Sequence, residues 1–172
     1  MTLLSRVHDA LLAKGYSYIS PLLGLLMFVV FAAFPWIMAD RGAIPLIQHY
    51  IELGKTWKWM ELMIEFGRVD AALAFLTALI LLPLAFWWAF RNRPVISGLT
   101  TIVSGLLLIY MFKVTDSTGI LFDLIAEWSR DLAGFGEPYN IAIGTYGMLF
   151  FGCLLLFTYF YSEMRSQRTR LS

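Results

Sequence analysis

Four long apolar segments, separated by polar stretches, dominate the pattern of hydrophobic and polar positions along the chain. They run over about 18–38, 71–90, 95–114 and 141–161, and none carries a charged residue near its centre. A helix needs about 20 apolar residues to cross a hydrocarbon core of roughly 30 Å. The pattern therefore predicts an all-α membrane protein whose single domain, 18–162, is a bundle of four transmembrane helices.

The stretches outside the predicted spans differ in length and in character. Residues 91–94, RNRP, leave room only for a tight hairpin turn, whereas 39–70 and 115–140 form longer loops. Two end segments remain, an N-terminal segment over 1–17 and a basic tail over 163–172. We expect both end segments and the tight turn to share one side of the membrane, with the longer loops on the other side.

Charge is distributed unequally between these two sides. The side with both ends of the chain and the tight turn carries seven basic and two acidic residues, whereas the other side carries six basic and ten acidic ones. Short cytoplasmic segments of membrane proteins are enriched in Lys and Arg. We therefore expect a multi-pass protein of a cell inner membrane, with both termini in the cytoplasm and the longer loops on the periplasmic side.

The first long loop contains the sequence GKTWKWMELMIEFGRVD, residues 54–70, in which charges recur every three or four residues between aromatic residues and methionines. On a helical wheel four of the charges fall in an arc of roughly 80°: Lys58, Glu61, Glu65 and Arg68. A narrow polar stripe on a broad apolar body is typical of a helix that lies at a membrane surface. Segment 117–138 repeats the pattern, so we expect two short amphipathic surface helices on the external side.

Both predicted surface helices present Trp and other large apolar side chains, and the first also presents Met. Large aromatic residues dominate the energetics of many protein interfaces. The candidate partner-binding residues are Trp57, Trp59, Met60, Met63, Phe66, Leu124 and Trp128. Besides the lipid bilayer, these residues predict contact with another membrane protein or self-association.

Acidic residues gather near the same predicted boundary: Glu61, Glu65, Asp70, Asp116 and Asp123. Together they could form a rim that attracts cations or admits protons. The more usual explanation is a solvated polar face, partly neutralised by basic neighbours. Asp70 begins the second span, where an acidic residue is favourable against the helix dipole.

Small residues on the third and fourth spans predict close packing of helices, because glycine lets two backbones approach each other. The candidate helix-packing residues are Gly98, Gly105, Gly144, Gly147 and Gly152. We expect the two small faces to meet within the bundle, and contact of one of them with a partner protein is the alternative. In the second span, Pro83 predicts a kink unless a neighbouring group satisfies the carbonyl that it leaves without a partner.

Composition and residue types narrow the classes of function. The chain is 59% hydrophobic and 15% charged with a net charge of +1, so nucleic acid is an unfavourable partner. The single cysteine, Cys153, cannot form an intramolecular disulfide, and His8 and His49 lie outside the spans, where axial ligands of a haem would be needed. The spans contain no paired aspartates and no Ser–His pair. We therefore expect no cofactor, no metal site and no catalytic site.

These observations favour a non-enzymatic accessory or interaction protein that docks or blocks another membrane protein. In size and topology the chain resembles the four-span immunity proteins that protect cells from pore-forming bacteriocins, and the exclusion proteins of conjugative plasmids. The alternative is a homo-oligomeric small transporter or channel protomer, for which the spans offer only hydroxyl groups. A third hypothesis, an enzyme acting on lipid or quinone, would require acid and base residues that the spans lack.

Overall fold

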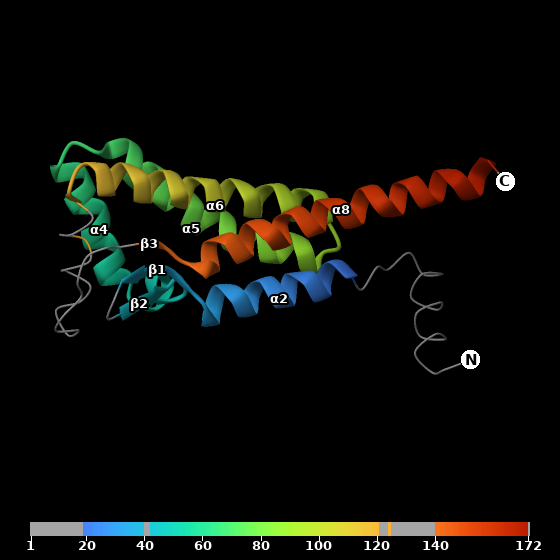
Figure 1. The fold of residues 1–172 in the computed structure, drawn as a ribbon, viewed down its shortest axis with the longest axis horizontal. Coiled ribbons are helices and arrows are strands. Elements are labelled where there is room, and N and C mark those ends of the chain that lie inside the picture. The colour runs from blue at the N-terminus through green and yellow to red at the C-terminus, as the bar shows by residue number, and fades with distance from the viewer. Residues whose placement is uncertain (1–18, 40–41, 121–123, 125–139, 172) are drawn as a thin grey trace.

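The structure is a computed structural model, and it describes the chain at residues 19–39, 42–120, 124 and 140–171. Within these residues the chain is mostly helical. Long helices lie side by side along most of the molecule, and smaller elements gather at one end of them (Figure 1).

Among the described residues, three helices are long and apolar enough to cross a membrane. They are α5 (Val69–Phe90), α6 (Pro94–Ser117) and the apolar part of α8 (Ile143–Leu171). Helix α6 packs against both α5 and α8. The predictions of a mainly helical fold and of a membrane protein are confirmed at this level.

The connection between α5 and α6 is the tight turn that the sequence predicts. Asn92 has a positive φ of 55°, a conformation that asparagine tolerates better than most residues. The N–H of Arg93 donates to the carbonyl of Trp88 at 2.8 Å, and the N–H of Asn92 donates to the carbonyl of Ala89 at 3.0 Å. These two bonds satisfy the last carbonyls of α5, and Pro94 then starts α6 where its missing N–H is harmless.

The first predicted span differs from the structure. Helix α2 (Ile19–Ala33) has 15 residues, whereas the hydrophobic pattern predicted a helix as far as residue 38. Pro35 has no N–H to continue the helix and disfavours helical geometry at residue 34. A 15-residue helix rises about 22 Å, which is less than the thickness of the hydrocarbon core. Helix α2 packs against α5 and α8.

The part of the chain that the structure describes also contains a three-stranded antiparallel sheet, which the sequence did not predict. Strand β1 (Pro35–Ala39) follows α2 and lies between β2 (Gly42–Pro45) and β3 (Asn140–Ile141). The N–H of Ala142 donates to the carbonyl of Trp36 at 2.8 Å. The sheet thereby joins the end of α2 to the segment that enters α8.

Two further helices, α3 (Gln48–Ile51) and α4 (Leu53–Glu65), complete the group of elements at this end. Helix α4 runs across the end of the bundle rather than along it (Figure 1). We call β1, β2, α3 and α4, residues 35–65, the cap unit. Helix α4 overlaps the predicted 54–70 segment, beginning one residue before it, and its place at a membrane surface stays a prediction. The second predicted surface helix, 117–138, falls mostly outside the described residues.

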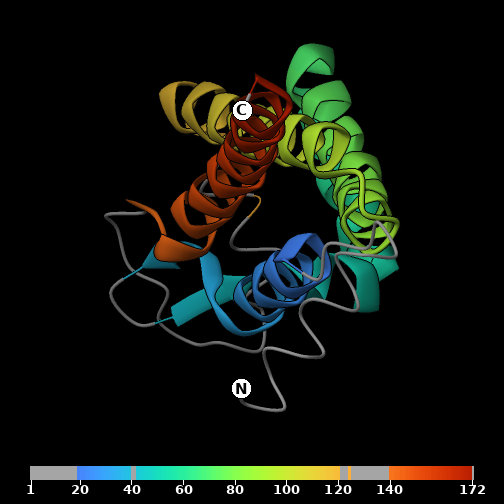
Figure 2. The ribbon, with the colours of Figure 1, turned by 90° about the vertical axis from the view of Figure 1, so that its right-hand side faces the viewer.

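The long helices surround a common interior (Figure 2), and glycines mark their closest approaches. A Cβ atom added to Gly98 would lie 2.7 Å from the carbonyl oxygen of Gly152, and one added to Gly105 would lie 2.6 Å from a methyl carbon of Leu149. Helices α6 and α8 are therefore in near contact along one face. The other two predicted packing glycines lie against the first part of the chain: Gly144 against the carbonyl of Pro35 and Gly147 against Val30.

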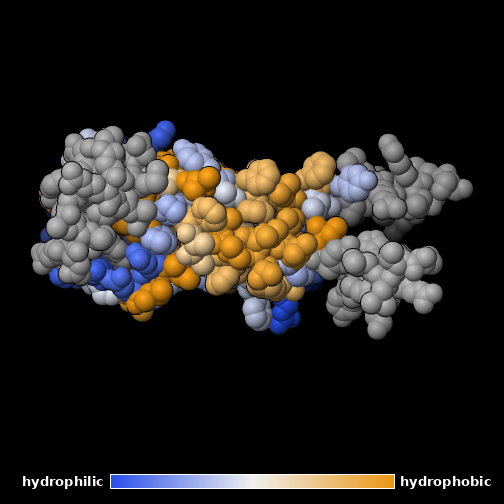
Figure 3. Space-filling view, turned by 60° about the horizontal axis from the view of Figure 1, so that its bottom comes forward, coloured by the Kyte–Doolittle hydropathy of each residue, from blue (hydrophilic) through white to orange (hydrophobic). Residues whose placement is uncertain are grey.

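The middle of the molecule carries a belt of apolar residues on its surface, while hydrophilic residues gather at the end with the cap unit (Figure 3). Large apolar side chains of the long helices, among them Leu73, Leu106 and Phe150, are more than half exposed. A soluble monomer rarely leaves so wide an apolar surface uncovered. The belt is the surface expected of helices surrounded by lipid.

Candidate functional site

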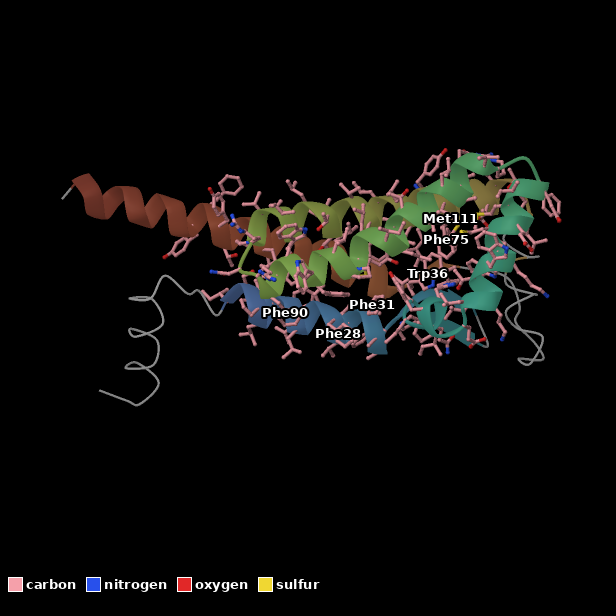
Figure 4. The ribbon with its side chains drawn as sticks, turned by 180° about the vertical axis from the view of Figure 1, so that it is seen from behind. Phe28, Phe31, Trp36, Phe75, Phe90 and Met111 are labelled. Atoms are coloured by element: carbon pink, nitrogen blue, oxygen red, sulfur yellow. The ribbon has the colours of Figure 1, made fainter. Side chains whose placement is uncertain are left out.

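A cluster of buried rings joins the cap unit to α5. It consists of Trp36 from β1, His49 from α3, Trp59 from α4 and Phe75 from α5, and all four side chains are almost completely buried. The rings of Trp36 and Phe75 are stacked with their centroids 6.0 Å apart, and Figure 4 shows these two side chains next to each other. The His49 ring lies edge-on to Trp59 at 4.9 Å and to Phe75 at 5.1 Å.

Hydrogen bonds fix His49 within this cluster. The indole N–H of Trp36 donates to Nε2 of His49 at 3.2 Å. The hydroxyl of Thr56 donates to the His49 carbonyl at 2.8 Å, so its oxygen accepts from Nδ1 of the same residue at 3.3 Å. Both contacts fit a neutral ring that carries its proton on Nδ1. Burial lowers the pKa of His49 from 6.5 to about 3, because a charged ring would lose its hydration.

Tyr50, the next residue of α3, contacts a different part of α5. Its hydroxyl donates to the carbonyl oxygen of Leu79 at 2.5 Å, and its ring lies edge-on to Phe31 of α2 at 5.5 Å. Leu79 lies four residues before Pro83, so its carbonyl is the one that has no helical N–H to accept from. The group that satisfies the carbonyl freed by Pro83 is therefore Tyr50. Burial of Tyr50 raises the pKa of its hydroxyl.

Asp70, one of the predicted rim residues, is engaged in a network at the start of α5. Both of its carboxylate oxygens accept from the Arg68 guanidinium, at 2.7 and 3.0 Å. The Tyr110 hydroxyl of α6 also donates to this carboxylate, at 2.6 Å. The network joins the beginning of α5 to the last part of α6 at a solvent-exposed position, which makes it a connection between helices.

The remaining rim residues do not converge on one described site. The carboxylate of Glu61 accepts from the indole N–H of Trp57 on its own helix, at 2.5 Å. Glu65 and Asp116 are exposed, and Asp123 lies outside the described residues. Within the described ranges, no three His, Cys, Asp or Glu side chains are arranged to hold a metal ion. A rim that attracts cations stays a prediction.

The predicted partner-binding residues fall into two groups in the structure. Trp59, Met63 and Leu124 are completely buried, and Met60 is half-buried. Trp57 and Phe66 are exposed, whereas Trp128 lies outside the described residues. Trp59 and Met63 are four residues apart and therefore share the face of α4 that packs on the aromatic cluster. The apolar pattern of the helix could not show which part of its broad apolar surface the rest of the chain covers.

Helix α4 has a second apolar face that the described chain leaves open. Leu53, Trp57 and Ile64 lie at helical spacing and are 68%, 60% and 52% exposed. On the wheel they lie between the buried face and the charged stripe. We call these three residues the α4 strip. Exposed Ile51 and Phe66 lie just beyond the two ends of the helix.

Sequence reasoning missed the roles of Trp36, Tyr50 and Thr56. The apolar pattern puts Trp36 in the first span, Tyr50 in the first long loop and Thr56 in the predicted surface helix. The signal that could have revealed Tyr50 is Pro83, since a proline in a span requires a donor for the carbonyl four residues earlier. Nothing in the sequence shows which residue supplies that donor.

No protein-family description, curated protein or solved structure matches the chain.

Proposed function

We propose that this protein is a non-enzymatic accessory protein of the cell inner membrane, which docks or blocks another membrane protein through the α4 strip. The observation that carries the proposal is that α4 buries one apolar face in the chain and leaves a second one open. Exposed Trp and aliphatic side chains on a rigid helix are suited to bury themselves in a partner. Roles of the immunity or exclusion type belong to this class.

The proposal includes four crossings of the membrane, with the first made by α2 together with β1. The ring contact between Trp36 and Phe75 supports it, because it places β1 beside the second turn of α5, beyond the end of α2. Backbone groups near lipid need partners, and β1 is paired with a strand on each side. The charge distribution supports a cytoplasmic location of both termini, with α3 and α4 of the cap unit on the periplasmic side.

The alternative, a transporter or channel protomer, gains less support from the interior. The buried hydroxyls of α6 donate to main-chain carbonyls: Ser97 to Ala85 at 2.7 Å and Thr101 to Ser97 at 2.8 Å. Ser104 donates to the carbonyl of Thr100 at 2.9 Å. The first bond joins α6 to α5 and the other two lie within α6, so these three hydroxyls are engaged by the backbone rather than directed at a pathway, which favours the docking role.

Site-specific photocrosslinking in native membranes tests the docking role. A photoreactive amino acid at position 57 should link the protein to one defined partner, whereas the same group at Leu106, on the lipid-facing side of α6, should not. The variant Trp57→Ala/Ile64→Ala should lose co-purification of that partner. Leu106→Ala/Phe150→Ala, which removes two equally exposed apolar side chains from the belt, should retain it.

Two results would contradict the proposal. One is the same crosslinked partner from position 57 and position 106, which would indicate proximity without a specific surface. The other is a homo-oligomer that is crosslinked through α6 and has no other partner, which would favour the transporter alternative.

A further inference from the structure

Pro83 divides helix α5 into two parts, which both pack on α6 but differ in their other neighbours. The first part carries Phe75, which packs in the aromatic cluster beneath the cap unit. The second part is held by hydroxyls of other helices, since Ser97 of α6 donates to the carbonyl of Ala85 and Ser20 of α2 donates to that of Ala89 at 3.1 Å. A proline interrupts the hydrogen bonds of the helix between these two parts, which is the arrangement of a hinge.

Among the described residues, Tyr50 replaces the hydrogen bond that is missing at Pro83. Its hydroxyl donates to the Leu79 carbonyl, which in lipid would otherwise lack a helical donor. Tyr50 belongs to the cap unit, and its neighbour His49 is held by Trp36 and Thr56. The position of the donor is therefore set by the cap unit and not by α5 itself.

The Pro83 side chain is exposed, so the core does not need proline at this position for packing. An alanine there would supply the N–H that Leu79 lacks, without creating a cavity. The chain instead combines the proline with a donor from another element. Because of this combination, the Leu79 carbonyl has its donor only when the cap unit lies against α5.

We propose that Tyr50 is a latch. While the cap unit is packed on α5, the bond from Tyr50 to the Leu79 carbonyl holds the two parts of α5 in line across Pro83, and movement of the cap unit breaks this bond and frees the hinge. Release leaves the Leu79 carbonyl without its donor and lets the two parts of α5 move relative to each other. The latch itself depends only on the contacts above. Its use, to transmit docking at the α4 strip to the membrane-spanning part, rests on the proposed function.

A double-mutant cycle in lipid nanodiscs tests the latch, with Tyr50→Phe, Pro83→Ala and the double variant compared with the unaltered full-length protein. Tyr50→Phe keeps the ring and its contact with Phe31 and removes only the donor. We expect it to increase amide hydrogen exchange several-fold over residues 80–88 and to lower the midpoint of thermal unfolding. In the Pro83→Ala background the same change should have little effect, because the backbone N–H gained at position 83 donates to the Leu79 carbonyl. Tyr146→Phe, which removes a hydroxyl from an exposed ring of α8, is the matched control and should change neither readout.

Equal effects of Tyr50→Phe in the two backgrounds would overturn the latch, because the hydroxyl would then act independently of the proline. An unchanged exchange rate after Tyr50→Phe would overturn it as well. If Tyr50→Phe does not accumulate in the membrane, recovery of folded protein on adding Pro83→Ala supports the latch and continued absence counts against it. The cycle needs no partner, so it can succeed where crosslinking from position 57 fails, and the two proposals fail separately.

Discussion

At the scale of single residues, His49 shows how burial changes the meaning of a residue type. A histidine in a loop suggests a ligand or a pH sensor. In the structure each ring nitrogen is matched to a partner that suits the neutral form: Trp36 donates to one, and the oxygen of Thr56 accepts from the other. A protonated ring would carry two donors and would face the Trp36 N–H with a second N–H. His49 therefore stabilises the attachment of the cap unit only while it is neutral.

Acidification should reveal this role. The folded protein keeps His49 neutral down to about pH 3, whereas the unfolded chain binds a proton below about pH 6.5. The stability that the neutral ring contributes is thus complete above pH 6.5 and is lost as the pH falls from 6.5 toward 3. The loss is about 1.4 kcal/mol per pH unit at most. The measurement is the midpoint of thermal unfolding in nanodiscs between pH 7.5 and pH 5.

His49→Gln is the control for this pH dependence, since its amide oxygen can still accept from Trp36 and does not titrate in this range. The variant should be less stable at pH 7.5 but should lose less stability on acidification. Parallel pH curves for the two proteins would show that carboxylates elsewhere cause the acid sensitivity.

The two tryptophans of α4 should respond differently to truncation. Trp59 is completely buried against Trp36, His49 and Phe75, so Trp59→Ala should cost about 3–5 kcal/mol of unfolding free energy. Trp57 is 60% exposed, so Trp57→Ala should change stability by no more than about 0.5 kcal/mol. Chemical unfolding followed by circular dichroism measures both. Similar losses for the two variants would mean that the second face of α4 is covered as well.

At the scale of elements, the pattern of long apolar segments predicted α5, α6 and the apolar part of α8 within a few residues, because apolar length and the RNRP turn define them locally. It failed for β1, where apolar residues suit a strand as well as a helix. The sheet could not be predicted, since β1 pairs with β3 about a hundred residues later and no local signal connects them. The candidate site could not be predicted for the same reason, because its rings come from four elements that only tertiary structure brings together.

Glycine positions allow a test of packing between elements. Gly98→Ala would place a Cβ 2.7 Å from the Gly152 carbonyl oxygen, so α6 and α8 must move apart, at a cost of about 1–3 kcal/mol. A Cβ at Gly54, near the start of α4, would meet nothing within 4 Å, so Gly54→Ala should be neutral or stabilising by up to about 1 kcal/mol. The midpoint of thermal unfolding, measured for both variants in one detergent, compares their stabilities. A neutral Gly98→Ala would show that the two helices are not in contact at this position in solution.

At the scale of the whole molecule, the central question is how often the chain crosses the membrane. Composition identifies a membrane protein, and three helices are long enough to span within the described residues. Whether α2 takes part in a further crossing depends on which part of α5 it and the following strand lie beside. Its first turns contact the end of α5, where Ser20 donates to Ala89, and the chain after it reaches Phe75 near the other end of the same helix. Helix and strand together therefore follow α5 over most of its length, although the helix alone does not.

A topology measurement should accordingly place the two ends of the chain on the same side. In a Cys153→Ala background, single thiols are introduced as Arg93→Cys in the α5–α6 turn and Thr118→Cys after α6, and a tag is placed at each end of the chain. We expect a membrane-impermeant maleimide to label position 118 in cells with a permeabilised outer membrane and position 93 only after lysis. Both tags should be protected from protease in the same cells, because four crossings return the chain to the cytoplasm.

The N-terminal tag distinguishes the topologies that the long helices allow. With three crossings and α2 lying in the outer half of the bilayer, the N-terminal tag would be digested while the C-terminal tag stayed protected. Labelling of position 93 in intact cells would instead reverse the whole orientation and place the α4 strip in the cytoplasm, where a periplasmic target could not reach it. Protection of both ends, with position 118 accessible, leaves the strip facing the periplasm, which the docking role requires.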